Sequence, residues 1–226
     1  MKRNQSGFTL IEIAIVLVII GLLLGGVLKG QELINSAKVK NLATDFKNVP
    51  IYIYGYQDKY KALPGDDANA KLHLGASAVQ NTVTATVGNG IINGKWYDSN
   101  WTGSTTDESY IFWQHIRMAG FGPGSTDPTN ISSYLPTNAV GGHIGITNSQ
   151  PTDNPIIGMV GTYVVCSDSI PFKFAKQLDV SLDDGNTATG SVMVTTAGTT
   201  TGGTPIPTTG NSTTNDDTPV LVCMGY

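Results

Sequence analysis

The sequence predicts an α+β protein in which a long N-terminal helix precedes a head built on an antiparallel β-sheet. Two observations support this fold class. The first is an apolar run over residues 8–28 that continues into an amphipathic pattern as far as about residue 61. The second is a set of short β-type runs in the second half of the chain, separated by segments rich in Gly, Thr and Asn. Helix and strand patterns that occupy separate parts of a chain are typical of α+β folds.

The apolar run is long enough to cross a membrane. Residues 8–28 are apolar except for Thr9 and Glu12. As an α-helix these 21 residues would measure about 31 Å at ~1.5 Å per residue, close to the ~30 Å core of a bilayer. Two basic residues precede the run, and Lys29 follows it. We therefore predict a membrane-spanning segment.

Two features separate this segment from an ordinary signal peptide. Gly7 stands before the apolar run, whereas a secretory signal carries an A-x-A-like cleavage site after its apolar region. Glu12 lies inside the run, and a lone ionisable residue in a membrane helix costs roughly 2.5–3.5 kcal/mol on insertion scales. Such a residue is expected to have a partner or a function.

The start of the chain resembles a known processing site. Residues 2–12 read KRNQSG followed by FTLIE. This arrangement, in register with the apolar run as far as Leu28, resembles the processing site of the type IV pilin and pseudopilin superfamily. The resemblance implies that a prepilin peptidase cuts between Gly7 and Phe8 and methylates the new amine of Phe8. It also implies that Glu12 acts in filament assembly by pairing with the Phe8 amine of a neighbouring subunit, its own, or both.

The resemblance further implies the pilin fold and a division of the chain into three parts. Residues 1–7 would be a leader peptide, residues 8–64 the long N-terminal helix and residues 65–226 a globular β-rich head. Within the helix, residues 8–28 would form the transmembrane segment or filament core. Residues 29–64 would form an amphipathic half that packs on the head. The competing interpretation is a plain membrane anchor with a stray carboxylate.

The second half of the predicted helix carries a stripe of apolar side chains. They recur at alternating steps of four and three residues: Leu42, Phe46, Val49, Ile53, Tyr56, Tyr60 and Leu63. That spacing is typical of a helix that buries one face. Pro50 lies within the helix and is expected to kink it, because proline lacks a backbone N–H. The helix is expected to end at the LPGDD segment, where Asp66 and Asp67 are interpreted as a solvated turn.

Four glycines occupy the membrane segment and its end: Gly21, Gly25, Gly26 and Gly30. Their G-x-x-x-G spacing favours close approach between helices. Each glycine also weakens a helix by about 1 kcal/mol relative to alanine. Many members of the superfamily that the chain resembles carry a proline at the position of Lys29, and this chain does not. Whether the helix melts between Gly25 and Gly30 during assembly therefore stays open.

The head is predicted to contain an antiparallel sheet and two short helices. Runs of β-type composition predict strands at residues 82–87, 142–147, 158–166, 190–196 and 219–223. The first helix is expected to open with a T-x-x-E capping box from Thr105 to Glu108. The second is expected to begin at Pro171, with Ser169 as its cap. Residues 198–218 are poor in apolar side chains and are expected to form a surface loop.

The two cysteines, Cys166 and Cys223, cannot by themselves form a four-ligand zinc site. In an exported chain an even cysteine count predicts one disulfide. Bridging them would close a loop of nearly sixty residues, worth about 4 kcal/mol in the chain-entropy model. Such a bridge resembles the cysteine-bounded C-terminal region of many pilins. Two free buried thiols are the alternative.

Charge and motifs argue against an enzyme and against a nucleic-acid-binding protein. Without its first seven residues the chain has 11 basic against 17 acidic side chains, whereas phosphate attraction needs clustered Lys and Arg. The sequence contains no nucleophile elbow, zinc-protease, P-loop or dinucleotide-binding motif. Its three histidines are far apart, and His115 is expected to be a structural or surface residue. We therefore expect no catalytic residues.

One acidic turn offers oxygen ligands for a metal. Asp183, Asp184 and Asn186, joined by Asp179, would present carboxylate and amide oxygens to Ca²⁺, which takes six to eight of them. The EF-hand spacing is missing, and Asp-Gly pairs are common in turns. The default expectation is no cofactor and no metal, with calcium at this turn as the open alternative.

These features together favour a structural subunit of a type IV pilus-like filament that serves adhesion, motility or surface attachment. The expected partners are other copies of the chain, prepilin peptidase and an assembly machine, and nucleic acid is not expected. The precursor would lie in a bacterial inner membrane, and the product in an extracellular pilus or a periplasmic pseudopilus. The alternatives are a pseudopilin of a type II secretion system and a membrane-anchored binding module that does not polymerise.

Overall fold

The structure is a computed structural model that describes residues 9–97 and 107–226. The chain divides into two compact units between Lys40 and Asn41. Helix α1 (Leu10–Tyr60) contributes to both units. In the first unit it is helical without interruption from Leu10 onward, as expected for a run with no Pro before residue 50. The side chains from Thr9 to Lys29 are all exposed.

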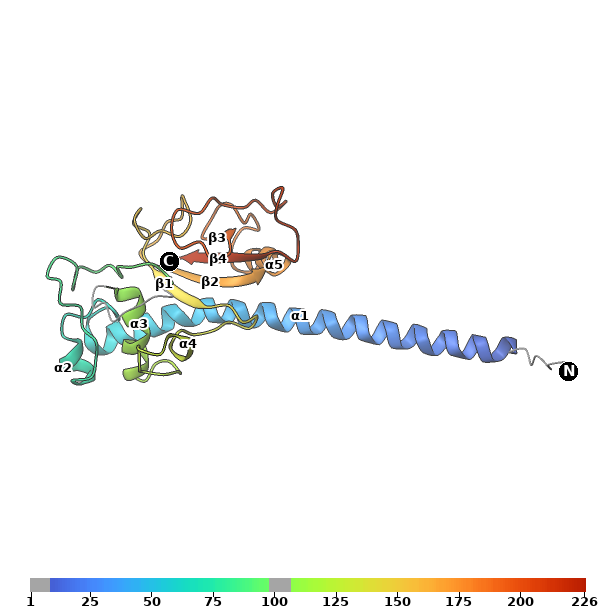
Figure 1. The fold of residues 1–226 in the computed structure, drawn as a ribbon, viewed down its shortest axis with the longest axis horizontal. Coiled ribbons are helices and arrows are strands. Elements are labelled where there is room, and N and C mark those ends of the chain that lie inside the picture. The colour runs from blue at the N-terminus through green and yellow to red at the C-terminus, as the bar shows by residue number, and fades with distance from the viewer. Residues whose placement is uncertain (1–8, 98–106) are drawn as a thin grey trace, which may run out of the picture. The chain divides into compact units, whose positions relative to one another are not determined.

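The second unit holds a four-stranded antiparallel sheet (Figure 1). Its strands are β1 (Ile144–Thr147), β2 (Val164–Pro171), β3 (Val192–Thr196) and β4 (Pro219–Gly225). Their order across the sheet is β1-β2-β4-β3, so β4 pairs with both β2 and β3. Consecutive residues of β3 and β4 are buried, which shows that both faces of the sheet are covered.

Four shorter helices lie among the described residues of the second unit. They are α2 (Ala70–Leu74), α3 (Glu108–Met118), α4 (Ile131–Tyr134) and α5 (Phe172–Leu182). α5 packs against β2, β3 and β4, and α3 packs against β1 and α2. Because α3 and α5 are three turns long, their apolar periodicity was visible in the sequence. α2 and α4 are about one turn long and carry no such signal.

The disulfide joins the two central strands of the sheet. Cys166 of β2 lies directly opposite Cys223 of β4, with their Cα atoms 4.1 Å apart. Both cysteines are fully buried and pack in a cluster with side chains from loops and strands: Trp96, Ile156, Met159, Val164, Met193 and Leu221. The predicted bridge is therefore confirmed, and it sits in the core of the second unit.

The predicted α+β class is confirmed, with the long N-terminal helix, the antiparallel sheet and the disulfide in the C-terminal region. The apolar stripe of α1 is buried within the second unit from Leu42 to Tyr56. The expected strand at residues 82–87 is wrong. That segment forms turns, in which the Val83 carbonyl accepts hydrogen bonds from the N–H groups of Thr86 and Val87. Alternating side chains favour a strand only where a partner strand is available.

Three smaller predictions about the head also need correction. Ser169 does not cap α5, because it belongs to β2 with a φ of 58° and Pro171 occupies the N-cap position. The loop over residues 198–218 does contribute to the core, since Ile206 is buried and its N–H donates to Val194 of β3 at 2.8 Å. The capping box predicted for α3 is also wrong, because Asp107 occupies the N-cap position and Glu108 is the first residue of the helix rather than the third. Thr105 and Thr106 lie outside the described residues.

α1 continues through Pro50, and Tyr226 compensates for the missing backbone donor. In an α-helix the N–H at position 50 would bond the carbonyl of Phe46, but proline has no N–H. The hydroxyl of Tyr226 donates to the Phe46 carbonyl at 2.7 Å instead. This bond ties the segment after β4 to the buried half of α1. No sequence pattern indicated it, because the two partners are 180 residues apart.

Candidate functional site

The candidate assembly site lies at the start of α1, where Glu12 caps its own helix. Thr9 immediately precedes the helix, and Glu12 is its third residue. The backbone N–H and the hydroxyl of Thr9 donate to Oε2 of Glu12 at 2.8 Å and 2.7 Å. In return the Glu12 N–H donates to the Thr9 hydroxyl at 3.4 Å. This is a reciprocal capping box, which satisfies backbone donors that the first turn of a helix leaves unpaired.

The capping box gives Glu12 a structural task that the sequence analysis overlooked. The T-x-x-E pattern of Thr9 to Glu12 was the available signal. Because both contacts from Thr9 use Oε2, capping does not engage Oε1 within the described part of the chain. Thr9 therefore orients this carboxylate at the start of an apolar helix. Gly7 and Phe8, the predicted cleavage and methylation positions, lie outside the described residues.

The helix behind Glu12 is apolar and unpartnered over its membrane-length segment. α1 is the one helix of the described residues that is long and apolar enough to cross a membrane, with a mean hydropathy of 2.8 over its most apolar window and none of that window buried. The glycines of this segment and its end, from Gly21 to Gly30, have open space where a Cβ would stand. Nothing in the described chain therefore requires glycine at these positions.

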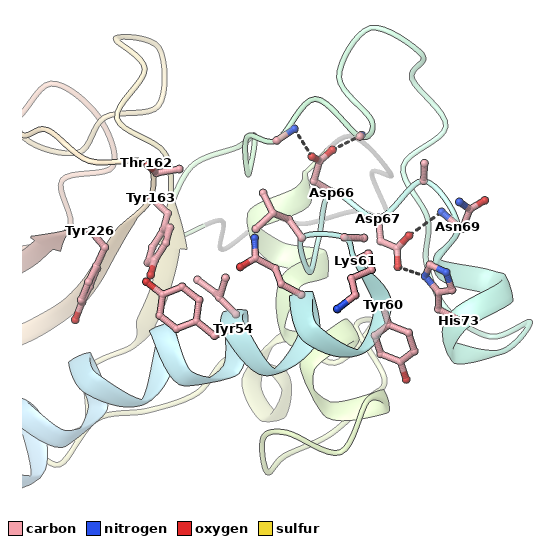
Figure 2. Close-up of a pocket in the computed structure, with 17 residues that line it drawn as sticks. Tyr54, Tyr60, Lys61, Asp66, Asp67, Asn69, His73, Thr162, Tyr163 and Tyr226 are labelled. Carbon is pink, nitrogen blue, oxygen red and sulfur yellow. Dashed lines mark hydrogen bonds and ion pairs between the residues drawn. The ribbon is translucent and has the colours of Figure 1, made fainter.

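The two aspartates of the LPGDD segment after α1 are buried and hydrogen-bonded to neighbouring parts of the chain, so the predicted solvated turn is wrong. Asp66 and Asp67 are both almost fully buried. Figure 2 shows the Asp66 carboxylate directed at the backbone N–H groups of a neighbouring loop. It accepts from Gly88, from Asn89 at 3.3 Å and from Gly90 at 2.7 Å. Burial raises the pKa of the Asp66 carboxyl, and these three donors act in the opposite direction.

Asp67 connects the end of α1 to α2. Its carboxylate accepts from the Tyr56 hydroxyl at 2.7 Å, from the Asn69 N–H at 2.8 Å and from Nδ1 of His73 at 2.6 Å. Figure 2 shows these last two contacts beside an open groove of about 910 Å³ at the end of α1. Both carboxylates of the groove are thus engaged in holding loops together, so we interpret Asp66 and Asp67 as structural residues.

The LPGDD segment also contacts α3, through its Gly65. Nδ1 of His115 accepts from the Gly65 N–H at 3.0 Å, and Nε2 of His115 donates to the Val79 carbonyl at 2.7 Å. Burial lowers the pKa of His115, so the ring is a neutral structural element. Gly65 has a φ of 93°, and a Cβ there would come within 2.5 Å of the Glu108 carbonyl oxygen. Only glycine fits both constraints.

Glu108, at the start of α3, is fully buried among amide donors. Its Oε1 accepts from Nδ2 of Asn81 at 2.5 Å, and its Oε2 accepts from both the N–H and Nδ2 of Asn93 at 2.9 Å. Burial raises the pKa of Glu108 to about 7, although these hydrogen bonds favour the charged form. Glu108 therefore ties two loop segments to α3.

The acidic turn predicted as a calcium alternative does gather three carboxylates. Ligand atoms of Asp179, Asp183 and Asp184 all lie within 4.8 Å of one another. Asp179 comes from the last turn of α5, and the other two follow that helix. Burial, together with Asp184 and Asp183, raises the pKa of Asp179 to about 6. The fourth predicted ligand, Asn186, uses its side-chain oxygen to accept from the Ala188 N–H at 3.3 Å.

The comparisons with known proteins bear on the N-terminal segment. Residues 2–28 match the family model of the prokaryotic N-terminal methylation motif. This motif is the prepilin-type signature of type IV pilins and pseudopilins. No curated protein and no solved structure matches the chain significantly. The predicted resemblance is therefore confirmed over the segment that contains Gly7, Phe8 and Glu12, and the chain carries a prepilin-type N-terminal motif.

Proposed function

We propose that this protein is the structural subunit of a type IV pilus-like filament. In this proposal a prepilin peptidase removes residues 1–7, and the apolar helix then polymerises. One observation carries the proposal. The methylation motif contains Glu12 and coincides with the membrane-length part of α1, whose side chains are all exposed in the single chain from Thr9 to Lys29. An apolar surface of this extent is stable in lipid or against other copies of the same helix.

The capping geometry supports a role for Glu12 in ordering the subunits. Cleavage after Gly7 would create an ammonium at Phe8, one residue before the cap. An ammonium and a carboxylate attract strongly in an apolar environment, where each is costly alone. Thr9 engages Oε2 of Glu12, so Oε1 can accept from the Phe8 amine of the same or a neighbouring subunit. Polymerisation would thereby provide a partner for a charge that is expensive in lipid.

The described second unit fits the surface of such a filament. Its core is closed by the disulfide between β2 and β4, which suits an exported protein exposed to an oxidising environment. The family model describes a segment of structural proteins and not an enzyme. We therefore assign the functional surface of the filament to the second unit and the contacts between subunits to the apolar part of α1.

Two substitutions at Glu12 test the proposal and separate charge from capping. Glu12→Ala removes both, whereas Glu12→Gln retains a side chain that serves in a capping box but carries no charge. We expect both variants to accumulate in the membrane and to yield at least about tenfold fewer filaments, because the charge pair sets the assembly register. Glu32→Ala is the control, since Glu32 is an exposed carboxylate of the same helix.

Filaments counted by negative-stain microscopy and by protein in the sheared surface fraction give the readout. Wild-type filament yield from Glu12→Ala would refute a role for Glu12 in assembly and would favour a non-polymerising anchor. Wild-type yield from Glu12→Gln alone would assign Glu12 to capping. Filaments found only in the periplasm would favour the pseudopilin of a type II secretion system.

A further inference from the structure

The second unit contains a small cavity that is lined by residues of α1, α3 and β1. Its volume is about 160 Å³, close to the ~150 Å³ of an engineered apolar cavity that holds one benzene molecule. The apolar part of its wall includes Val49, Ile116, Pro136 and Ile144. Its polar side chains include Asp45, Trp113 and Arg117. The cavity is therefore large enough for one six-membered ring, and polar groups line it as well.

The guanidinium of Arg117 is a buried cation without an anionic partner in the described chain. The side chain is 9% exposed. Its Nε donates to the Pro123 carbonyl at 2.9 Å, and its Nη1 donates to the Ser125 carbonyl at 2.8 Å. None of the ion pairs among the described residues includes Arg117. Arginine stays protonated in proteins and buried charges are usually paired, so this cation lacks a counter-ion.

The indole of Trp113 provides a second donor without a partner in the wall of this cavity. Trp113 is 5% exposed, and its Nε1 has no hydrogen-bond acceptor among the described residues. A buried donor left without an acceptor costs about 1–3 kcal/mol. Trp96, the other described tryptophan, differs, because its Nε1 donates to the Thr199 carbonyl at 2.8 Å. The Trp113 N–H therefore requires an acceptor that the described chain does not supply.

Asp45 lines the same cavity and does not supply this acceptor. Its carboxyl group is half-buried, and burial raises its pKa to about 6. No ion pair in the described part of the chain joins it to Arg117, and the Trp113 N–H stays unpaired. The guanidinium and the indole are thus two donors that face no anion of the described residues.

We propose that this cavity binds a small organic carboxylate whose apolar part is about the size of a six-membered ring. The carboxylate accepts charge-assisted hydrogen bonds from the Arg117 guanidinium and a further bond from the Trp113 N–H. The apolar part packs against Val49, Ile116 and Ile144, and its removal from water favours binding. Because the Pro123 and Ser125 carbonyls already hold the guanidinium, little side-chain freedom is lost on binding.

The charge of the cavity favours a ligand with a single negative charge. Among the described residues that line it, Arg117 is the one basic side chain, and Asp45 is an acidic one. A phosphate or sulfate dianion would need more positive charge and would leave the apolar wall unused. The site belongs to the second unit and not to the apolar part of α1, so it goes beyond the proposed role in a filament.

The test is a titration of the full chain in detergent with benzoate, followed by ligand-observed NMR, with protein-free detergent as the blank. Benzoate should bind with a Kd on the order of 1 mM, as expected for a ligand of this size. Benzyl alcohol keeps the ring and lacks the charge, whereas acetate keeps the charge and lacks the ring. Each should bind at least about tenfold more weakly than benzoate.

Substitutions assign the binding to this cavity. Trp113→Phe keeps an aromatic ring and removes the N–H, and it should weaken benzoate binding at least about fivefold. Trp96→Phe is the matched control and should bind as the wild type does, because Trp96 bonds Thr199 and does not line the cavity. Arg117→Lys keeps the charge without the planar fork, and it should also weaken binding at least about fivefold. Urea unfolding shows whether each variant is folded.

Three results would overturn the proposal. Wild-type protein that does not bind benzoate would show that the cavity takes no apolar carboxylate. Equal affinity for benzyl alcohol would show that the negative charge of the ligand plays no part. Wild-type affinity in a folded Trp113→Phe variant would place any bound benzoate elsewhere. None of these outcomes depends on filament formation, so the proposed function is tested separately.

Discussion

At the scale of single residues, acidic side chains organise much of the second unit from inside. Asp66, Asp67, Glu108 and Asp179 are all buried, although acidic residues are rarely found in cores. The sequence placed Asp66 and Asp67 in a solvated turn because Pro and Gly precede them. Their burial depends on N–H donors that lie up to 24 residues away along the chain. Local pattern carries no information about such donors, so these roles could not be predicted.

Glu108 is expected to make stability depend on pH. Its pKa rises from 4.5 to about 7 in the folded chain, so the folded state retains a proton that the unfolded chain has already lost. Between about pH 4.5 and pH 7 the folded state binds more protons, and the free energy of unfolding therefore falls as pH rises. We expect the wild type to be less stable at about pH 8 than at about pH 5, by up to ~3 kcal/mol.

Urea unfolding of wild type and Glu108→Gln at the two pH values measures this contribution. Glu108→Gln should reduce the difference, because it cannot ionise, and Asp179 and Asp45, whose pKa values burial raises to about 6, should account for the remainder. Asp58→Asn is the control at an exposed position, and it should retain the wild-type difference. If Glu108→Gln retained the full pH dependence, another group would be responsible.

At the scale of elements, periodicity in the sequence predicted the long helix. It did not predict which short segments find a partner strand in the sheet. α1 was predictable because its apolar pattern extends over many turns. The composition of the four strands was recognised, but β2 begins six residues later than expected, at Val164. Residues 82–87 had the alternation of a strand and lack a partner strand in the fold. Pairing is a tertiary property, so alternation alone does not determine it.

The Pro50 position of α1 gives a prediction at the same scale. Tyr226→Phe should cost about 1–3 kcal/mol of unfolding free energy, because the Phe46 carbonyl loses its donor. In a Pro50→Ala background the helix regains its own N–H for that carbonyl, and Tyr226→Phe should then cost at least about 1 kcal/mol less. Denaturant unfolding of the four proteins completes the double-mutant cycle. Equal costs in both backgrounds would show that Tyr226 does not replace the missing donor.

At the scale of the whole molecule, the disulfide and the sheet order explain how a loop-rich second unit stays folded. The bridge closes a stretch of 57 residues between neighbouring central strands. The paired change Cys166→Ser and Cys223→Ser should lower the free energy of unfolding by about 4 kcal/mol, chiefly by freeing the unfolded chain. Urea midpoints followed by tryptophan fluorescence test this value. Reduced wild type should behave as the double variant does, and an unchanged midpoint in both would contradict the account.

The candidate assembly site was predictable from sequence to a greater extent than the interior of the second unit. Gly7, Phe8 and Glu12 are recognised by their register with an apolar run, and that register is local. The pairing of Cys166 with Cys223 was also within reach, because the chain has two cysteines. The T-x-x-E signal by which Thr9 orients Glu12 was present in the sequence but was overlooked. That contact orients the carboxylate of the proposed charge pair.

The identity of the N-terminal peptide tests the central claim most directly. Protein from sheared surface appendages would be digested and its N-terminal peptide sequenced by mass spectrometry. Filament assembly after prepilin processing predicts a peptide that begins at Phe8 with a methylated amine. A chain that keeps Met1 and its first seven residues, and is found only as single molecules in the membrane fraction, would contradict the account.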